Sequence, residues 1–280
     1  MTGTNPASAR ARSGGWVPCL LLAAVLCGAA PAWGEPSPGS GYTPEETFRQ
    51  SQSVLGRTVG DYAFLDTEGR PVKLSDFRGR PLVVNLVYTG CTSVCPLVVD
   101  LLGRSAAVAR EALGENSFSI VTVGFDSAAD TPQRMRAFAR SHGIDAPNWR
   151  FLSADAETVN NLARDLGFVF FPSAKGFDHA AQTTVLDREG RVYRQIYGAD
   201  FEVPALVEPL KYLVFGGNED FTSLTGIWNR VRLLCTLYNP ASGHYRFDAS
   251  IFVGLTVGFA SLVAVGVFLV RNWLQVRTLR

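Results

Sequence analysis

Residues 82–96 read Leu-Val-Val-Asn-Leu-Val-Tyr-Thr-Gly-Cys-Thr-Ser-Val-Cys-Pro, and this stretch indicates the fold class. The apolar, β-branched run before Gly90 is typical of a buried parallel strand. Pro96 opens an apolar helical pattern, so Cys91 is expected in the loop after the strand and Cys95 at the helix start. Open α/β sheets place their ligand sites at this edge. The stretch therefore predicts copper or redox chemistry at a strand–helix junction.

The position of the second cysteine also predicts its ionisation. Unpaired N–H groups at the start of a helix favour negative charge, so Cys95 is expected to ionise more readily than a free thiol. The thiolate is the form of cysteine that binds soft metal ions and attacks disulfides. Both kinds of chemistry remain open at this point.

Composition narrows the candidates for function and for ligands. The chain has 280 residues, a formal net charge of +1 and no basic patch interleaved with aromatic residues, which predicts no nucleic-acid partner. Five cysteines, two of them in a leader, are too few for a disulfide-stapled scaffold. Cys19 and Cys27 fall in the leader, so a metal site must be built from a short set of cysteines and histidines: Cys91, Cys95, Cys235, His142, His179 and His244.

The N-terminal segment has the plan of a secretory signal. Residues 1–34 contain basic residues, then an apolar run, then small residues. We expect cleavage between Ala32 and Glu35, and an uncleaved membrane anchor is the alternative. Residues 35–42 are rich in Pro, Gly and Ser and are expected to form a flexible linker.

Residues 43–217 alternate between strand and helix patterns, which predicts one α/β domain with a mixed sheet and helices on its faces. A helix is expected to start at Thr43, and the last two strands are expected to form a hairpin. The expected strands are residues 62–66, 71–74, 82–88, 117–125, 149–152, 180–186 and 192–197. The expected helices are residues 96–113, 130–142, 154–166 and 203–215.

The C-terminal part predicts a membrane helix. Residues 218–250 form a juxtamembrane segment in which residues 224–237 have an amphipathic helical pattern, expected to lie on the membrane surface or to dock on the domain. Residues 251–270 are uncharged and long enough to cross the ~30 Å hydrocarbon core. Arginines in residues 271–280 follow at once, which predicts a cytoplasmic C-terminus. We therefore expect a single-pass protein of the bacterial inner (cytoplasmic) membrane with its domain facing the periplasm or the outside.

A third candidate ligand, His179, lies directly before the expected strand 180–186. Its imidazole is expected to reach the same sheet edge as Cys91 and Cys95, although a lone histidine is more often a capping or surface residue. Two thiolates and an imidazole suit Cu(I), and histidine also holds Cu(II). Asp178 is expected either to hydrogen-bond the imidazole or a backbone group, or to be a turn carboxylate.

Three segments together resemble the Sco/SenC family over about residues 43–215. The first is residues 88–96, Tyr-Thr-Gly-Cys-Thr-Ser-Val-Cys-Pro. The second is Asp126 together with Asp130 and the Thr-Pro pair that follows it. The third is Asp178 and His179, followed by Leu-Asp-Arg-Glu-Gly-Arg at residues 186–191.

The resemblance implies a thioredoxin-like fold and a membrane-tethered copper-binding factor for cytochrome c oxidase assembly. It implies that Cys91, Cys95 and His179 are the copper ligands. This chain carries Thr92 where many members have a proline. It also has a C-terminal helix where many members are held by an N-terminal one.

Two other groups of side chains carry open interpretations. Asp126 is expected near the copper or as a loop acid, and in the second case Asp130 caps the following helix. Cys235 and His244 flank a turn outside the membrane. They are interpreted as an auxiliary metal site, as a site where Cys235 pairs with another chain, or as an unpaired thiol without such a role.

The leading interpretation of function is a copper chaperone, not an enzyme, that passes copper by ligand exchange to an oxidase subunit with a CuA-type site or to another copper protein. The alternative is a thiol–disulfide reductase in which one of Cys91 and Cys95 attacks and the other resolves. A simple local disulfide is also open. A peroxidase is least favoured, because Tyr88 stands where that chemistry usually has a threonine.

Overall fold

The computed structural model describes residues 43–174, 176–216 and 223–278. The expected signal peptide, its cleavage site and the linker lie outside the described residues, as does the C-terminal Arg280. The expectations for these segments therefore stay predictions.

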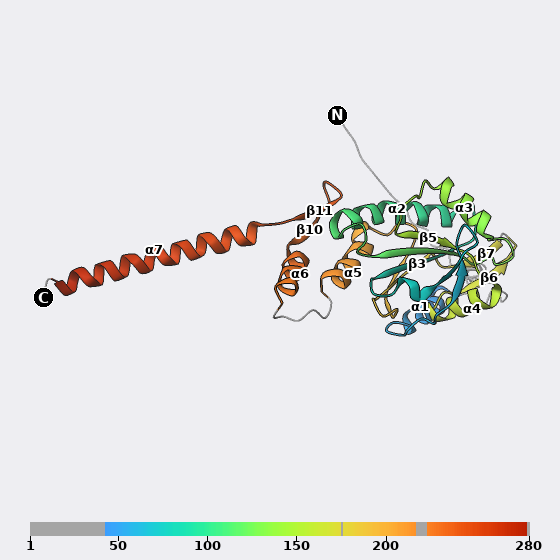
Figure 1. The fold of residues 1–280 in the computed structure, drawn as a ribbon, viewed down its shortest axis with the longest axis horizontal. Helices are drawn as coiled ribbons and strands as arrows, with labels where there is room; N and C mark the ends of the chain where they lie inside the picture. Colours follow the sequence, from blue (N-terminus) through green and yellow to red (C-terminus); the bar gives the residue numbers. More distant parts are fainter. Residues whose placement is uncertain (1–42, 175, 217–222, 279–280) are drawn as a thin grey trace, which may run out of the picture. The chain divides into compact units, whose positions relative to one another are not determined.

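A five-stranded mixed sheet forms the centre of the domain (Figure 1). Its strand order is β5-β4-β3-β8-β9. Strands β3, β4 and β5 are parallel, and β8 and β9 continue the sheet as an antiparallel hairpin. Every residue of β3 and β4 is buried, as expected for strands covered on both faces. The strands are β3 (Leu82–Val87), β4 (Ser119–Gly124), β5 (Trp149–Leu152), β8 (Gln182–Leu186) and β9 (Val192–Tyr197).

Helices cover the sheet, and Figure 1 shows α1 and α2 on opposite sides of it. Two of them begin with a capping side chain: Thr131 accepts the N–H of Arg134, and Asp155 accepts the N–H of Thr158. The helices are α1 (Pro44–Ser53), α2 (Val94–Leu113), α3 (Pro132–Ser141), α4 (Ala156–Asp165) and α5 (Val203–Phe215). The expected mixed sheet with helices on its faces is confirmed.

Short elements surround the central sheet. Strands β1 (Ala63–Leu65) and β2 (Pro71–Lys73) pair as expected, and a 3₁₀ turn, η1 (Leu74–Phe77), follows them. A second hairpin, β6 (Phe170–Ser173) with β7 (Gly176–His179), was not expected from the sequence. Its strands have four residues each and are only partly buried, so they lack a clear apolar alternation.

The C-terminal part contains α6 (Leu224–Cys235), the hairpin of β10 (Thr236–Asn239) and β11 (His244–Phe247), and α7 (Ser250–Thr278). The amphipathic helix ends two residues before its expected end because the chain enters β10. Helix α7 is the one helix within the described ranges that is long and apolar enough to cross a membrane, over Phe252–Trp273.

Of the two positions expected for the juxtamembrane segment, docking on the domain is observed. The buried Lys211 on α5 donates to the carbonyl oxygen of Thr236 at 2.9 Å and forms an ion pair with Glu208. The hydroxyl of Tyr245 on β11 donates to Glu208 at 2.9 Å. These contacts attach the β10–β11 hairpin to α5.

Candidate metal centre

Cys91 lies in the loop between β3 and α2, with its sulfur against the first turn of the helix. Its N–H donates to the carbonyl of Tyr88 at 3.1 Å, and its sulfur accepts the N–H of Cys95 at 3.4 Å. Ser93 at the N-cap position makes no side-chain capping bond. The sulfur of Cys91 therefore takes the part that a capping oxygen has in other helices.

The two thiols differ in acidity, and the difference is the reverse of the expectation. Burial opposes ionisation of Cys91, but N–H groups of Cys95, Ser93 and Val94 outweigh it and lower the pKa of Cys91 to about 7. Burial raises the pKa of Cys95 well above that of a free thiol. The prediction that Cys95 ionises readily was wrong, because the helix N–H groups point at Cys91 and Cys95 is enclosed.

His179, at the end of β7, lies beside Cys95. Its Nε2 atom is 3.9 Å from the sulfur of Cys95, and its Nδ1 atom is 3.0 Å from the carbonyl oxygen of Ala180. A carbonyl oxygen only accepts, so Nδ1 carries the proton and Nε2 presents its lone pair toward the sulfur. This arrangement leaves Nε2 able to accept a hydrogen bond or to bind a metal ion.

Aromatic rings surround this imidazole. The ring centroids of Tyr88, Phe125 and Phe168 lie 6.0, 5.3 and 5.6 Å from that of His179. Burial lowers the pKa of His179, which keeps the ring in the neutral form that binds metal ions. Sequence reasoning missed these rings, although the Phe-rich run of residues 168–171 was a visible signal.

A glycine allows the β6–β7 hairpin to approach the cysteines. Gly176 has a φ of +115°, a backbone conformation that other residues rarely adopt. A side-chain Cβ at this position would lie 2.9 Å from the hydroxyl oxygen of Tyr88. Tyr88 in turn is next to Cys91, and burial followed by the charge of that thiol raises the pKa of the phenol.

Asp130 does not cap a helix; its carboxylate stabilises the loop between β3 and α2 that carries Cys91, which we call the cysteine loop. Its buried carboxylate accepts the N–H and hydroxyl of Thr89 at 2.8 and 2.7 Å and the N–H of Asp126 at 2.9 Å. Thr131 provides the cap instead, so the helix-cap interpretation of Asp130 was wrong. Burial raises the pKa of Asp130 despite these bonds.

Asp178 does not bond the imidazole through Nδ1, because that nitrogen bonds the carbonyl of Ala180. It is exposed on β7, opposite Phe171. Its negative charge acts on the imidazole from a distance and favours protonation, but burial has the larger effect on the pKa of His179.

The three candidate ligands lie near one another, but their side chains do not converge on one point that could hold a metal ion. All three described cysteines are free thiols, so the local disulfide is not observed. Within the described parts of the chain, no three His, Cys, Asp or Glu side chains are arranged to hold an ion. The structure pairs Cys95 with His179 and Cys91 with the helix N–H groups.

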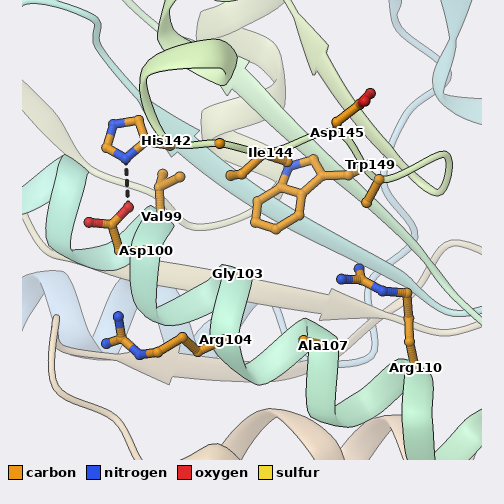
Figure 2. A pocket seen from close by; sticks show the side chains of 12 residues that line it. Val99, Asp100, Gly103, Arg104, Ala107, Arg110, His142, Ile144, Asp145 and Trp149 are labelled. Carbon is orange, nitrogen blue, oxygen red and sulfur yellow. Dashed lines mark hydrogen bonds and ion pairs between the residues drawn. The ribbon is translucent and has the colours of Figure 1, made fainter.

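The second candidate group is not brought together as a metal site. His244 is paired with Glu111 of α2, with Nδ1 2.7 Å from a carboxylate oxygen, and Cys235 is buried. A hollow of about 550 Å³ between α2 and the loop after α3 is also separate from the cysteines. Figure 2 shows His142 and Asp100 bonded at its rim, and Cys91, Cys95 and His179 are not among its lining residues.

Comparison with known proteins decides the family. The SCO1/SenC family model matches residues 50–214. The chain belongs to the SCO1/SenC family. The resemblance seen in the three sequence segments is thereby confirmed, and with it the thioredoxin-like fold.

Individual relatives of this SCO1/SenC chain are distant. It is 22% identical to the SCO1 protein homolog of Bacillus subtilis over 157 residues, which cover 54% of this chain and 80% of the relative. A crystal structure from Aquifex aeolicus VF5 has a TM-score of 0.52 and 28% identity and covers 59% of this chain and 96% of its own. BsSco, described as a member of the Sco family of cytochrome c oxidase assembly proteins, has a TM-score of 0.51 and 17% identity, covering 57% and 95%.

The family match ends at residue 214, before α6. The β10–β11 hairpin and α7 thus lie outside the part of this SCO1/SenC chain that defines the family.

Proposed function

We propose that this SCO1/SenC protein is a membrane-tethered copper chaperone that binds copper through Cys91, Cys95 and His179 and delivers it to a respiratory oxidase. The observation that carries the proposal is the Cys95–His179 pair, in which Nε2 faces the sulfur at 3.9 Å and Nδ1 is bonded to Ala180. Two thiolates and an imidazole form a donor set that suits Cu(I), and the imidazole also accepts Cu(II).

Each of the three residues starts from a different protonation state. The pKa of Cys91 of about 7 makes this thiol partly ionised at neutral pH, and His179 is held neutral by burial. Cys95 is protonated and must release its proton when copper binds.

The transfer of copper is proposed to proceed by ligand exchange. An acceptor with its own thiol or imidazole ligands would replace the ligands of this chain one at a time, so copper is never released to water. The proposed acceptor is an oxidase subunit with a CuA-type site. The description of BsSco as a member of a family of cytochrome c oxidase assembly proteins supports this choice.

The proposed location is the bacterial inner membrane, with one span and the domain in the periplasm. The span is α7, whose apolar part covers Phe252–Trp273. Arginines at positions 271, 277 and 280 surround its C-terminal end, and positive charges are retained on the cytoplasmic side. The leader-like residues 1–34 support export of the domain.

Oxidase activity in cells at limiting copper tests this function. Strains carrying the wild type, His179→Ala, Cys91→Ser and the control His244→Ala are compared with and without added copper. His244 is a matched control because it is a histidine paired with Glu111 away from the cysteines. We expect normal activity in the control, loss in both site variants, and partial rescue of His179→Ala by copper.

The same strains separate the chaperone from a thiol–disulfide reductase. Disulfide exchange needs Cys91 and Cys95 but not the imidazole. Normal oxidase activity in His179→Ala at limiting copper, together with its loss in Cys91→Ser, would show that copper delivery is the wrong function. Purified His179→Ala should still reduce a model disulfide.

A further inference from the structure

Large apolar side chains are exposed on α6, on the β10–β11 hairpin and at the start of α7. The exposed fractions are 49% for Ile227, 58% for Trp228, 75% for Leu234, 47% for Phe247 and 41% for Phe252. We call these five residues the juxtamembrane apolar surface. Single exposed apolar residues are common on soluble proteins, but a contiguous group marks an interaction site.

Three of these residues are in direct contact although they come from three elements. The ring centroids of Trp228 and Phe247 are 6.4 Å apart, and those of Phe247 and Phe252 are 6.3 Å apart with nearly parallel planes. Ile227 and Leu234 are two helical turns apart on α6, which places them on one side of the helix. Trp228, Phe247 and Phe252 therefore form one continuous surface, and Ile227, the chain neighbour of Trp228, and Leu234 add exposed apolar area on the same helix.

The surface continues directly into the candidate membrane span. Phe252 is the first residue of the apolar part of α7, Phe252–Trp273, and it is also part of the ring series. A surface that touches this residue adjoins the lipid that the span would enter.

The opposite side of the hairpin is already occupied by the domain. Thr236 and Tyr245 are buried and are bonded to Lys211 and Glu208 of α5. Leu233 of α6 also lies near Gly216 at the end of α5. The juxtamembrane apolar surface is thus the part of α6, the β10–β11 hairpin and the start of α7 that does not pack on the domain.

We propose that the juxtamembrane apolar surface lies in the lipid interface, so that the domain touches the membrane beside α7 as well as through it. The proposal rests on the membrane tether of the proposed function. Lipid is the occupant because the surface is continuous with the span. Tryptophan also favours the boundary of the hydrocarbon region, where its ring is buried and its N–H stays hydrated. The domain would then be held by two contacts and would not rotate freely about α7.

Quenching of tryptophan emission by brominated lipid tests this position in the full chain. The chain is placed in lipid nanodiscs, one chain per disc, made of phosphatidylcholine and phosphatidylglycerol with bromine either near the headgroups or deep in the acyl chains. Trp16 and Trp33 are replaced by Phe in all variants. In one variant Trp273→Phe leaves Trp228 as the reporter, and in a second Trp228→Phe leaves Trp273; the buried Trp149 is constant background.

A matched control reports an exposed ring elsewhere on the domain. Phe48 on α1 is 54% exposed, so Phe48→Trp in a chain lacking both Trp228 and Trp273 should keep its emission. We expect Trp228 to lose emission most strongly with bromine near the headgroups. Because each disc holds a single chain, such a loss also excludes a second copy as the partner of this surface.

Two results would overturn the inference, and only the second would also contradict the membrane tether of the proposed function. Loss of emission for Trp273 but not for Trp228 would show that the span is in lipid while the apolar surface is not, so only the inference fails. No loss for either residue would mean that α7 is not in the membrane, and the tether of the proposed function would fail with it.

Discussion

The sulfur of Cys95 and Nε2 of His179 lie 3.9 Å apart although 84 residues separate them in the chain. Cys95 lies in the first turn of α2, and His179 is the last residue of the β6–β7 hairpin. The bond from Nδ1 to Ala180 fixes which nitrogen faces the sulfur. A thiol and an oriented imidazole are thus held side by side by the fold, and under the proposed function this lowers the cost of ordering the ligands when copper binds.

The first prediction concerns the reactivity of the two thiols toward iodoacetamide. Cys91 should react with a midpoint near pH 7, because its pKa is about 7, whereas Cys95 should react slowly at every pH up to 9 because burial raises its pKa. Mass spectrometry of alkylated peptides at a series of pH values measures both. Faster modification of Cys95 than of Cys91 would contradict the assignment.

The same pKa shifts predict the pH dependence of stability. The pKa of Cys91 is lowered by folding, so its contribution is present above the unfolded value of 9.0 and is lost as pH falls through about 7. Between pH 7 and 9 the free energy of unfolding of wild type should therefore increase relative to that of Cys91→Ser. Urea unfolding of both proteins at these two pH values measures the difference. An equal pH dependence in the two proteins would show that Cys91 is not acidified by the fold.

The second prediction is one copper ion per chain. Cys91→Ser, Cys95→Ser or His179→Ala should each remove high-affinity binding, and affinity of the wild type should fall as pH is lowered because protons compete for the sulfur and nitrogen atoms. His142→Ala is a control, since His142 is paired with Asp100 at a separate hollow. Metal content after dialysis measures the stoichiometry. Full occupancy in the double variant of Cys91 and Cys95 would place the metal elsewhere.

The sequence predicted the central strands because β3 and β4 are rich in Val, Leu and Ile, with few polar residues between them. It predicted the general place of Cys91 and Cys95 because a strand–helix junction has a clear signal. It did not predict which thiol is acidic, since that depends on where the N–H groups of the first helical turn point. A side-chain direction of this kind is set by the folded loop and not by spacing along the chain.

The sequence also did not predict the side chains that surround His179. The β6–β7 hairpin is short and half exposed, so periodicity gives no signal for it. The role of Asp130 was mistaken for a related reason. An acid before Thr-Pro is a common helix cap, and only the tertiary structure shows that the carboxylate turns inward to Thr89.

The third prediction tests Asp130 as the support of the cysteine loop. Asp130→Ala leaves the backbone N–H groups of Thr89 and Asp126 without their acceptor, and each unsatisfied buried group costs about 1–3 kcal/mol. We expect the free energy of unfolding to fall by about 2–4 kcal/mol in urea. Asp126→Ala is the control, because Asp126 contributes its backbone N–H and carbonyl to this network. Equal destabilisation by the two substitutions would argue against a specific role of the Asp130 carboxylate.

The fourth prediction concerns the attachment of the β10–β11 hairpin to the domain. Lys211→Met removes the donor to the carbonyl of Thr236 and the partner of Glu208. Amide hydrogens of residues 236–247 should then exchange at least about tenfold faster, since loss of a charged hydrogen bond costs about 1.5–3 kcal/mol. Lys73→Met on the exposed end of β2 is the matched control. Unchanged exchange in the hairpin would mean that Lys211 does not hold it.

The last prediction is the orientation of α7. Arginines at the C-terminal end of the span, at positions 271, 277 and 280, are expected to stay in the cytoplasm, because moving them across the membrane is opposed by the positive-inside preference. A reporter that is active only in the cytoplasm should therefore be active when fused after Arg280. The same reporter fused after Ala249, before the span, should be exported and inactive. Immunoblots establish that both fusions are equally abundant. An inactive fusion after Arg280 at normal abundance would reverse the orientation and place the SCO1/SenC domain on the cytoplasmic side, where it would not meet the proposed acceptor site facing the periplasm.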